Sequence, residues 1–213
     1  MIFQIFFKVR QKPAFRLCLA LMICLSFQLS QAQTILVHGD SLAAGYGINP
    51  DEGWVELLKQ ELQPEHEVLN SSISGETTRG GLERLPVLLS TVKPDVVILE
   101  LGANDGLRGF QISLMQQNLE TMVAMIQDMG AKVILVGTHL PPNFGERYTQ
   151  PFFNAFATVA NESNSAYLPF LLEGVALDQQ LMQSDGLHPN EAAQPVILQN
   201  LLPLVNSALS VDN

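Results

Sequence analysis

Cysteine is scarce in this 213-residue chain, and its two cysteines, Cys18 and Cys24, both lie within the first 32 residues. The same segment carries four basic residues ahead of an uncharged apolar run over residues 17–29, and Ser30-Gln31-Ala32 follows as a small-x-small sequence. These features are typical of a secretory signal peptide. We expect residues 1–32 to be removed, so the mature chain has no cysteine and forms no disulfide.

Long hydrophobic runs are also absent. The run over residues 17–29 is shorter than the roughly 20 apolar residues that a membrane-spanning helix needs. We therefore expect no stable membrane anchor after signal cleavage, and a periplasmic or secreted protein; the alternative is that the segment is retained as an anchor. Neither cysteine lies in a lipoprotein-type cleavage pattern, so we expect no lipid anchor either.

Positive charge is low. Four of the 11 Lys and Arg residues lie in the first 32 residues, so seven remain against 21 Asp and Glu, a formal net charge of −14. Nucleic-acid binding requires a basic surface, so this balance argues against it. Residues 33–213 show no internal repeat and have the length of one domain. The sequence leaves the oligomeric state open, with a monomer favoured.

Several cofactor motifs are missing as well. The sequence has no glycine-rich phosphate loop, and no second ligand lies at metal spacing from His38, His66 or His139, which we expect to be structural or exposed to solvent. No Gly-x-Ser-x-Gly motif surrounds Ser41, which argues against the ordinary α/β-hydrolase fold. We therefore expect no metal and no cofactor.

What is present is an alternation of apolar strands and amphipathic helices. Strands are predicted at residues 34–38, 67–70, 95–101, 132–138 and 166–168. Helices are predicted at residues 54–62, from Thr77 or Thr78 to Pro94, along the apolar positions from 115 to 129 before Gly130, at about 151–161, and across 197–205. Such alternation indicates βαβ units, a parallel sheet covered on both faces, and an α/β fold class.

Polar motifs follow three of these strands. Ser41 comes after the first strand, Gly75 ends the loop after the second, and Asn104 follows the third. Because ligands of such sheets bind outside the carboxyl ends of the strands, we expect these three residues to lie at one edge.

A serine hydroxyl needs a neighbouring base to become a nucleophile. The segment Asp185-Gly186-Leu187-His188-Pro189 supplies one: His188 is predicted to take the proton of Ser41, and Asp185 to orient the imidazole. Attack on a carbonyl creates an oxyanion, for which the backbone N–H groups of Ser41 and Gly75 and the Asn104 amide are candidate donors. A carboxylate cannot donate, so Asp105 is excluded from that role.

Each motif also has a simpler interpretation. Gly39-Asp40-Ser41 and Asp185-Gly186 are common turn sequences, and Gly75 can be a backbone hinge. Asn104-Asp105-Gly106 can be an Asx turn that caps the next helix. Taken one at a time, these interpretations are preferred; taken together, the motifs point to a hydrolase.

In order along the chain, Gly39-Asp40-Ser41-Leu42, Gly75, Gly102-Ala103-Asn104-Asp105 and Asp185-Gly186-Leu187-His188-Pro189 resemble the four blocks of the SGNH or GDSL hydrolases. Residues 72–77, 104–110 and 186–190 are most similar to the periplasmic acyl-CoA thioesterase I, lysophospholipase L1 and arylesterase group. Ala103 stands where close relatives commonly have glycine.

The resemblance implies a three-layer α/β/α fold with a five-stranded, flavodoxin-like parallel sheet. It implies Ser41, Asp185 and His188 as the catalytic triad, with Gly75 and Asn104 completing the oxyanion hole. It further implies that residues 105–111 form a mobile loop beside the acyl site and that residues 140–144 line an acyl groove.

The function expected from these observations is a serine esterase that cleaves small-molecule acyl esters and thioesters through an acyl-enzyme. Two alternatives stay open. One is a polysaccharide or cell-wall O-acetyl esterase of the same fold, and the other is a catalytically silent binding module.

Overall fold

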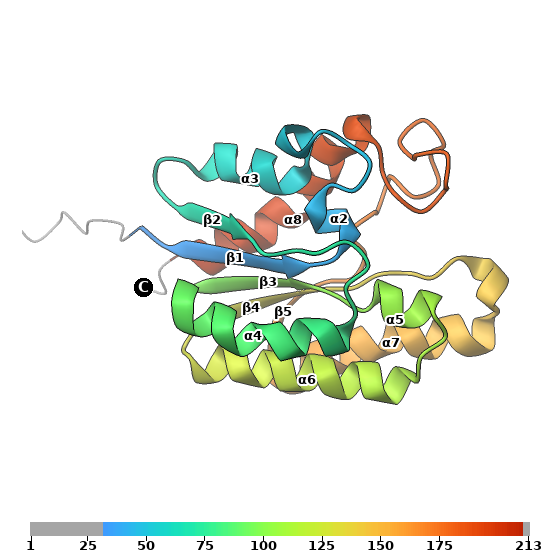
Figure 1. The fold of residues 1–213 in the computed structure, drawn as a ribbon, viewed down its shortest axis with the longest axis horizontal. Coiled ribbons are helices and arrows are strands. Elements are labelled where there is room, and N and C mark those ends of the chain that lie inside the picture. Colours follow the sequence, from blue (N-terminus) through green and yellow to red (C-terminus); the bar gives the residue numbers. More distant parts are fainter. Residues whose placement is uncertain (1–31, 211–213) are drawn as a thin grey trace, which may run out of the picture. The chain divides into compact units, whose positions relative to one another are not determined.

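The computed structural model describes residues 32–210 (Figure 1). The expected signal peptide, apart from Ala32, lies outside the described residues. Within residues 32–210, no helix combines the length and apolar character needed to cross a bilayer.

A parallel sheet of five strands forms the centre of the fold, as the sequence predicts. Its strands are β1 (Thr34–Gly39), β2 (Glu67–Asn70), β3 (Val96–Glu100), β4 (Lys132–Val136) and β5 (Ala166–Leu168). Their order across the sheet is β2-β1-β3-β4-β5, and every pair of neighbours is parallel. This is the flavodoxin-like order, in which the direction of winding reverses between β1 and β3.

Helices cover both faces of the sheet and complete the expected three layers. The helices α3 (Trp54–Leu62) and α8 (Gln194–Leu209) lie on one face, and α4 (Thr78–Val92), α6 (Ile112–Asp128) and α7 (Glu146–Ser163) lie on the other (Figure 1). Central strands are therefore buried on both sides, and all five residues of β3 are buried. This explains why these strands are continuous apolar runs rather than alternating ones.

Most differences from the predicted elements occur at helix ends. Helix α7 begins at Glu146, five residues before the predicted start near Pro151, and α8 begins at Gln194 rather than near Ile197. Helix α4 continues through Pro86. An interior proline removes one helical hydrogen bond, but the buried Leu85 and Leu89 on either side hold α4 against the sheet.

Two short helices, α2 (Ser41–Ala44) and α5 (Ala103–Leu107), follow β1 and β3 directly. Neither was predicted, because one turn of helix is too short to show a periodic apolar pattern. Three short 3₁₀ helices, η1 (Pro50–Glu52), η2 (Pro142–Phe144) and η3 (Glu191–Ala193), lie in connections.

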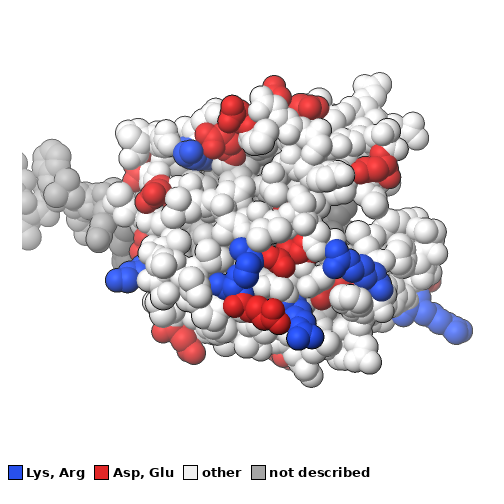
Figure 2. Space-filling model, viewed as in Figure 1, with Lys and Arg blue, Asp and Glu red and all other residues white. Residues whose placement is uncertain are grey.

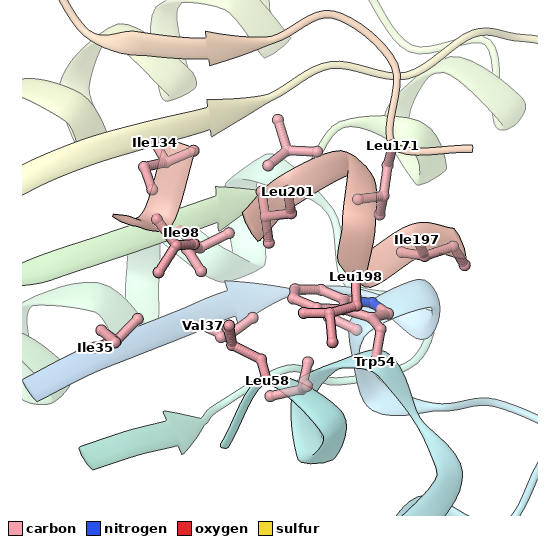
Figure 3. Packing of buried hydrophobic residues seen from close by; sticks show 14 of the residues in the cluster. Ile35, Val37, Trp54, Leu58, Ile98, Ile134, Leu171, Ile197, Leu198 and Leu201 are labelled. Carbon is pink, nitrogen blue, oxygen red and sulfur yellow. The ribbon is translucent and has the colours of Figure 1, made fainter. Parts of the chain in front are cut away.

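The core between the sheet and the α3 and α8 layer centres on Trp54 (Figure 3). Ile35 and Val37 of β1 project into this layer, whereas Leu36 between them faces the opposite layer. Trp54 is fully buried, and its indole N–H donates to the carbonyl of Leu42 at 3.0 Å. The core therefore holds the short helix α2 directly.

Charged side chains of both signs are interspersed on the face seen in Figure 2. Three basic residues pair with nearby carboxylates: Arg84 with Glu76 at 2.8 Å, Arg79 with Glu83 at 3.1 Å, and Lys59 with Glu56 at 3.3 Å. Each of these three positive charges is therefore neutralised locally by a carboxylate.

Candidate active site

Ser41 is the first residue of α2, at the carboxyl end of β1. The Asp40 side chain caps this helix by accepting the Leu42 backbone N–H at 3.1 Å, and Gly45 ends it in the left-handed conformation. The Asn70 amide donates to the Ala43 carbonyl at 2.8 Å, and Trp54 binds the Leu42 carbonyl. These bonds fix a helix that is too short to be stable alone.

His188 lies between Ser41 and Asp185. Its Nε2 is 2.9 Å from the Ser41 hydroxyl oxygen, and its Nδ1 is 2.7 Å from Asp185 Oδ2. The structure thus joins residues 147 positions apart in the sequence. Asp185-Gly186 is also the turn that its composition indicates, since Asp185 Oδ1 accepts the backbone N–H groups of Leu187 and His188 at 2.9 and 3.0 Å.

These hydrogen bonds determine the proton arrangement of the imidazole. The His188 backbone N–H, followed by the His188 ring and the Leu187 N–H, lowers the pKa of Asp185 to about 2. Near neutral pH Asp185 is therefore a carboxylate that only accepts hydrogen bonds. Neutral His188 then carries its proton on Nδ1 and presents the lone pair of Nε2 to Ser41.

The loop after β2 carries Gly75 beside the end of β1. The Ser71 and Ile73 backbone N–H groups donate to the Val37 and Gly39 carbonyls at 2.9 and 3.1 Å. Gly75 has a φ of 80°, a conformation that disfavours side chains, and its carbonyl accepts a hydrogen bond from Arg108 at 2.9 Å.

The three candidate oxyanion donors are all accessible from solvent. Ser41, Gly75 and Asn104 are each partly exposed, and the Asn104 amide donates to Asp40 Oδ2 at 3.0 Å. Among residues 32–210, the backbone N–H groups of Ser41 and Gly75 donate to no protein acceptor. Both N–H groups, and the second N–H of the Asn104 amide, are therefore available to an anion.

Two carboxyl groups are buried beneath this site, and the sequence assigns a role to neither. Glu100, at the end of β3, accepts the Asp40 backbone N–H at 3.2 Å. Burial raises the pKa of Asp40 to about 6, and burial followed by the charge of Asp40 raises the pKa of Glu100 well above its usual range. A neutral Glu100 thus supports an Asp40 carboxylate that orients Asn104.

The packing around this pair explains why a glycine stands at position 39. A Cβ atom at Gly39 would lie 2.5 Å from Glu100 Oε2 and 3.0 Å from the Ala43 Cβ. Only glycine leaves room for the carboxyl group. The capping role of Asp40 was not predicted, because the one-turn helix that it caps has no periodic apolar pattern.

His38 is structural, as expected. Its Nε2 lies 3.0 Å from the Gly81 carbonyl and its Nδ1 lies 3.1 Å from the Ser71 hydroxyl, so it connects β1 with the Gly75 loop and with α4. Burial lowers the pKa of His38 to about 4, against a smaller raising effect of the Gly81 bond.

We expect the His38 contribution to stability to decrease as the pH falls from 6.5 to 4. In that pH range the His38 side chain binds a proton in the unfolded chain but not in the folded one. The free energy of unfolding should therefore fall by about 3 kcal/mol through this group. Asp40 acts in the opposite sense, since its raised pKa favours the folded state as the pH falls from 6 to 3.8. The measurement is therefore the difference in urea unfolding free energy between the wild type and His38→Gln. A pH-independent difference would contradict the prediction.

Asp105 holds the start of α4. Its carboxylate accepts the Thr78 backbone N–H at 2.8 Å and the Thr78 hydroxyl at 2.7 Å, while Thr77 caps the helix by accepting from Gly80 N–H at 3.3 Å. Both carboxylate oxygens are thus occupied. Its position agrees with a structural role rather than oxyanion binding.

The two segments expected beside an acyl group differ in character. Residues 105–107 continue α5, and the Tyr148 hydroxyl lies 3.1 Å from the Gly106 carbonyl and 3.2 Å from the Phe110 carbonyl. Leu140 is buried against Gly106 in the core, so only the distal part of residues 140–144, including Phe144, faces solvent.

The part of the chain that the structure describes contains no candidate metal-binding site. Residues 32–210 contain no group of three or more His, Cys, Asp or Glu side chains arranged to hold a metal ion. His66 accepts the Gln33 backbone N–H at 3.3 Å, and the His139 ring stacks on Phe153 with centroids 4.1 Å apart.

A flavodoxin-like sheet with a serine, histidine and aspartate array at its carboxyl edge defines a serine hydrolase, and the relatives make it one that acts on esters. A family model described as the GDSL-like lipase/acylhydrolase family matches residues 37–195. The chain belongs to this family, which confirms the resemblance in its sequence motifs.

Three relatives cover most of the chain. Esterase TesA of Pseudomonas aeruginosa is 47% identical over 90% of this chain and 96% of its own. Thioesterase 1/protease 1/lysophospholipase L1 of Escherichia coli K12 is 42% identical over 87% and 91%. The crystal structure of the psychrotrophic esterase EstA from Pseudoalteromonas sp., inhibited by monoethylphosphonate, is 41% identical with a TM-score of 0.79, covering 83% of this chain and 98% of that chain.

Proposed function

We propose that this protein hydrolyses acyl esters and thioesters through an acyl-enzyme on Ser41. The observation that carries the proposal is the placement of His188, with Nε2 2.9 Å from Ser41 Oγ and Nδ1 2.7 Å from Asp185. Relatives named as an esterase and as a thioesterase and lysophospholipase support this substrate class.

Acylation begins when Ser41 Oγ attacks the substrate carbonyl carbon while its proton passes to His188 Nε2. Asp185 stabilises the imidazolium that results. The backbone N–H groups of Ser41 and Gly75 and the Asn104 amide stabilise the oxyanion. When the tetrahedral intermediate collapses, the carbonyl carbon to leaving-group bond breaks, and the alkoxide or thiolate takes the proton from His188.

Deacylation repeats these steps with water as the nucleophile. His188 Nε2 removes a proton from the water, the hydroxyl oxygen bonds to the acyl carbon, and Ser41 leaves with the proton returned by His188. The products are a carboxylic acid and an alcohol or thiol. Every proton transfer is made by one imidazole.

An apolar acyl group is favoured over a sugar-bound acetyl group by the exposed side chains on the loops at this edge of the sheet. These are Tyr46, Ile73, Phe110, Phe144 and Leu187, each between 37% and 52% exposed. Large apolar side chains left partly open to water at one edge are typical of a surface that binds apolar ligands.

A series of p-nitrophenyl esters from C2 to C16 tests the acyl preference. We expect kcat/KM to rise with chain length above C2, by up to about fourfold per methylene while the chain is being buried, because each buried CH₂ contributes roughly 0.8 kcal/mol. The measurement is initial rate on each ester, on palmitoyl-CoA, on a lysophospholipid and on acetylated xylan. Maximal activity at C2 with rapid xylan deacetylation would instead support the O-acetyl esterase alternative.

We also propose that residues 1–32 direct export of the enzyme, to the periplasm or out of the cell, and are then removed. The basic residues, short apolar run and Ala32 support this. Sequencing of the secreted or periplasmic product tests it, with Gln33 as the expected first residue; an intact N-terminus would contradict cleavage.

A further inference from the structure

The segment that carries His188 and Asp185 is a hairpin held by its own backbone. Met182 and Pro189 form an antiparallel bridge, and the Gln183 N–H donates to the His188 carbonyl at 2.8 Å. The Asn190 N–H donates to the Leu181 carbonyl at 2.8 Å. These bonds define the hairpin, residues 181–190, but none of them sets its position relative to Ser41.

The Gln183 side chain connects the hairpin with the segment after α2. Its Nε2 donates to the Pro189 carbonyl at 2.9 Å within the hairpin and to the Tyr46 carbonyl at 2.7 Å across 137 residues. Both N–H bonds of the amide are thereby used. A Cβ atom at Gly47 would overlap Gln183 Oε1, so the amide also packs closely against the backbone after Tyr46.

The Tyr46 side chain contacts the imidazole itself. The ring centroids of Tyr46 and His188 are 4.6 Å apart, and the ring planes are inclined by 43°. Such a contact restricts rotation of the imidazole about its Cβ–Cγ bond. Gln183 thus binds the carbonyl of Tyr46, the same residue whose ring contacts His188.

Only two hydrogen bonds within residues 32–210 join the hairpin to residues 39–48. One is the Gln183 to Tyr46 bond, and the other is the His188 to Ser41 bond, which must change during each proton transfer. The first is therefore the hydrogen bond that remains to hold the hairpin in register with Ser41 throughout the reaction.

We propose that Gln183 is a positioning residue for His188, which it aligns with Ser41 through the Tyr46 and Pro189 carbonyls. This inference rests on the proposed function of His188 as the base. Gln183 touches neither Ser41 nor the reacting atoms, and it acts by fixing the residues on both sides of the imidazole. Sequence reasoning had no local signal for it, because Tyr46 lies 137 residues away.

The test replaces Gln183 with methionine, which has similar length and no donor, and with glutamate, which has the same shape but loses both donors when ionised. We expect kcat on a short p-nitrophenyl ester to fall by about 10²-fold, the effect of a misplaced catalytic group, while KM changes less than about twofold. Gln179→Met is the matched control, because Gln179 is exposed and its side chain makes no hydrogen bond among residues 32–210. It should retain wild-type kcat.

Two further measurements separate positioning from general stability. The downfield proton resonance of His188 Nδ1–H should persist in Gln183→Met at temperatures well below the melting temperature, because the contacts of Asp185 with Leu187 and His188 do not include the Gln183 side chain. Tyr46→Ala should also lower kcat. Its effect should be less than additive with that of Gln183→Met, because both substitutions loosen the same restraint on the position of the His188 imidazole.

Wild-type kcat with only a lower melting temperature would overturn the proposal, as would a raised KM with unchanged kcat. If Gln183→Met does not fold, wild-type kcat in Gln183→Glu at a pH where the glutamate is ionised would overturn it, because that variant keeps the shape of the side chain and loses both donors. These outcomes are distinct from failure of the proposed function, which would appear as activity in an enzyme that lacks Ser41.

Discussion

Replacement of Ser41 with alanine is expected to lower kcat on p-nitrophenyl esters by roughly 10⁴–10⁶-fold, since removal of a triad nucleophile leaves only oxyanion stabilisation and substrate binding. The substitution removes one oxygen from a partly exposed site, and the cap and the carbonyl contacts of α2 come from Asp40, Asn70 and Trp54. Stability should therefore change little. Initial rates and urea unfolding of the same preparation measure both effects.

Ser90→Ala provides the matched control. Ser90 is exposed near the end of α4, and its hydroxyl bonds only to the Val87 carbonyl within the described chain. Wild-type rates are expected for this variant. Ester hydrolysis by Ser41→Ala at more than about one tenth of the wild-type rate would be incompatible with a nucleophilic role.

Asp185→Asn is expected to cost about 10⁴-fold in kcat while preserving the hairpin. The asparagine oxygen can still accept the Leu187 and His188 backbone N–H groups, which hold the turn at 2.9 and 3.0 Å. Its NH₂ group then faces His188 Nδ1, so the imidazole moves its proton to Nε2. With Nε2 protonated, His188 cannot accept the proton of Ser41.

The corresponding control is Asp178→Asn. Asp178 is also in an Asx turn, where its carboxylate accepts the Gln180 N–H at 2.9 Å, but the triad contacts do not include it. Steady-state kinetics should give wild-type values for Asp178→Asn. A fall of less than tenfold for Asp185→Asn would show that the carboxylate does not set the imidazole proton.

The parallel sheet and the strand-end positions of Ser41, Gly75 and Asn104 follow from hydrophobic pattern, because a strand covered on both faces must be a continuous apolar run. The order of the strands was implied only by the family resemblance. The run at Val96–Leu99 illustrates this, and all of its residues are buried. Parallel connection then fixes one edge for the polar groups, whichever strands are neighbours. Thus short-range sequence information predicts which residues lie at that edge.

Apart from the triad, hydrogen bonds between residues far apart in the sequence were not predicted. The Gln183 amide donates to the Tyr46 carbonyl, and Glu100 accepts the backbone N–H of Asp40, which lies 60 residues earlier in the chain. No local sequence pattern predicts either hydrogen bond. Helix α7 begins before Pro151 and α4 continues through Pro86 because packing on the sheet compensates for the lost hydrogen bonds. Local propensity contains none of these tertiary contributions.

The active site depends both on local sequence pattern and on tertiary contacts. Pattern and spacing predict a nucleophile, a base and an acid, whereas the surrounding groups set their geometry and protonation. The Asp40 and Glu100 pair supports Asn104 from below, and the hydrogen bonds at Asp185 keep it ionised with a pKa of about 2. A catalytic residue set with an incomplete supporting shell would be expected to lose much of its rate.

Mass spectrometry of the enzyme quenched in acid during turnover of a long-chain p-nitrophenyl ester tests the central claim most directly. The account predicts an added acyl mass on the peptide that contains Ser41, together with a burst of p-nitrophenol, and neither signal in Ser41→Ala. An acyl group on another residue, or a burst that survives in Ser41→Ala, would contradict it.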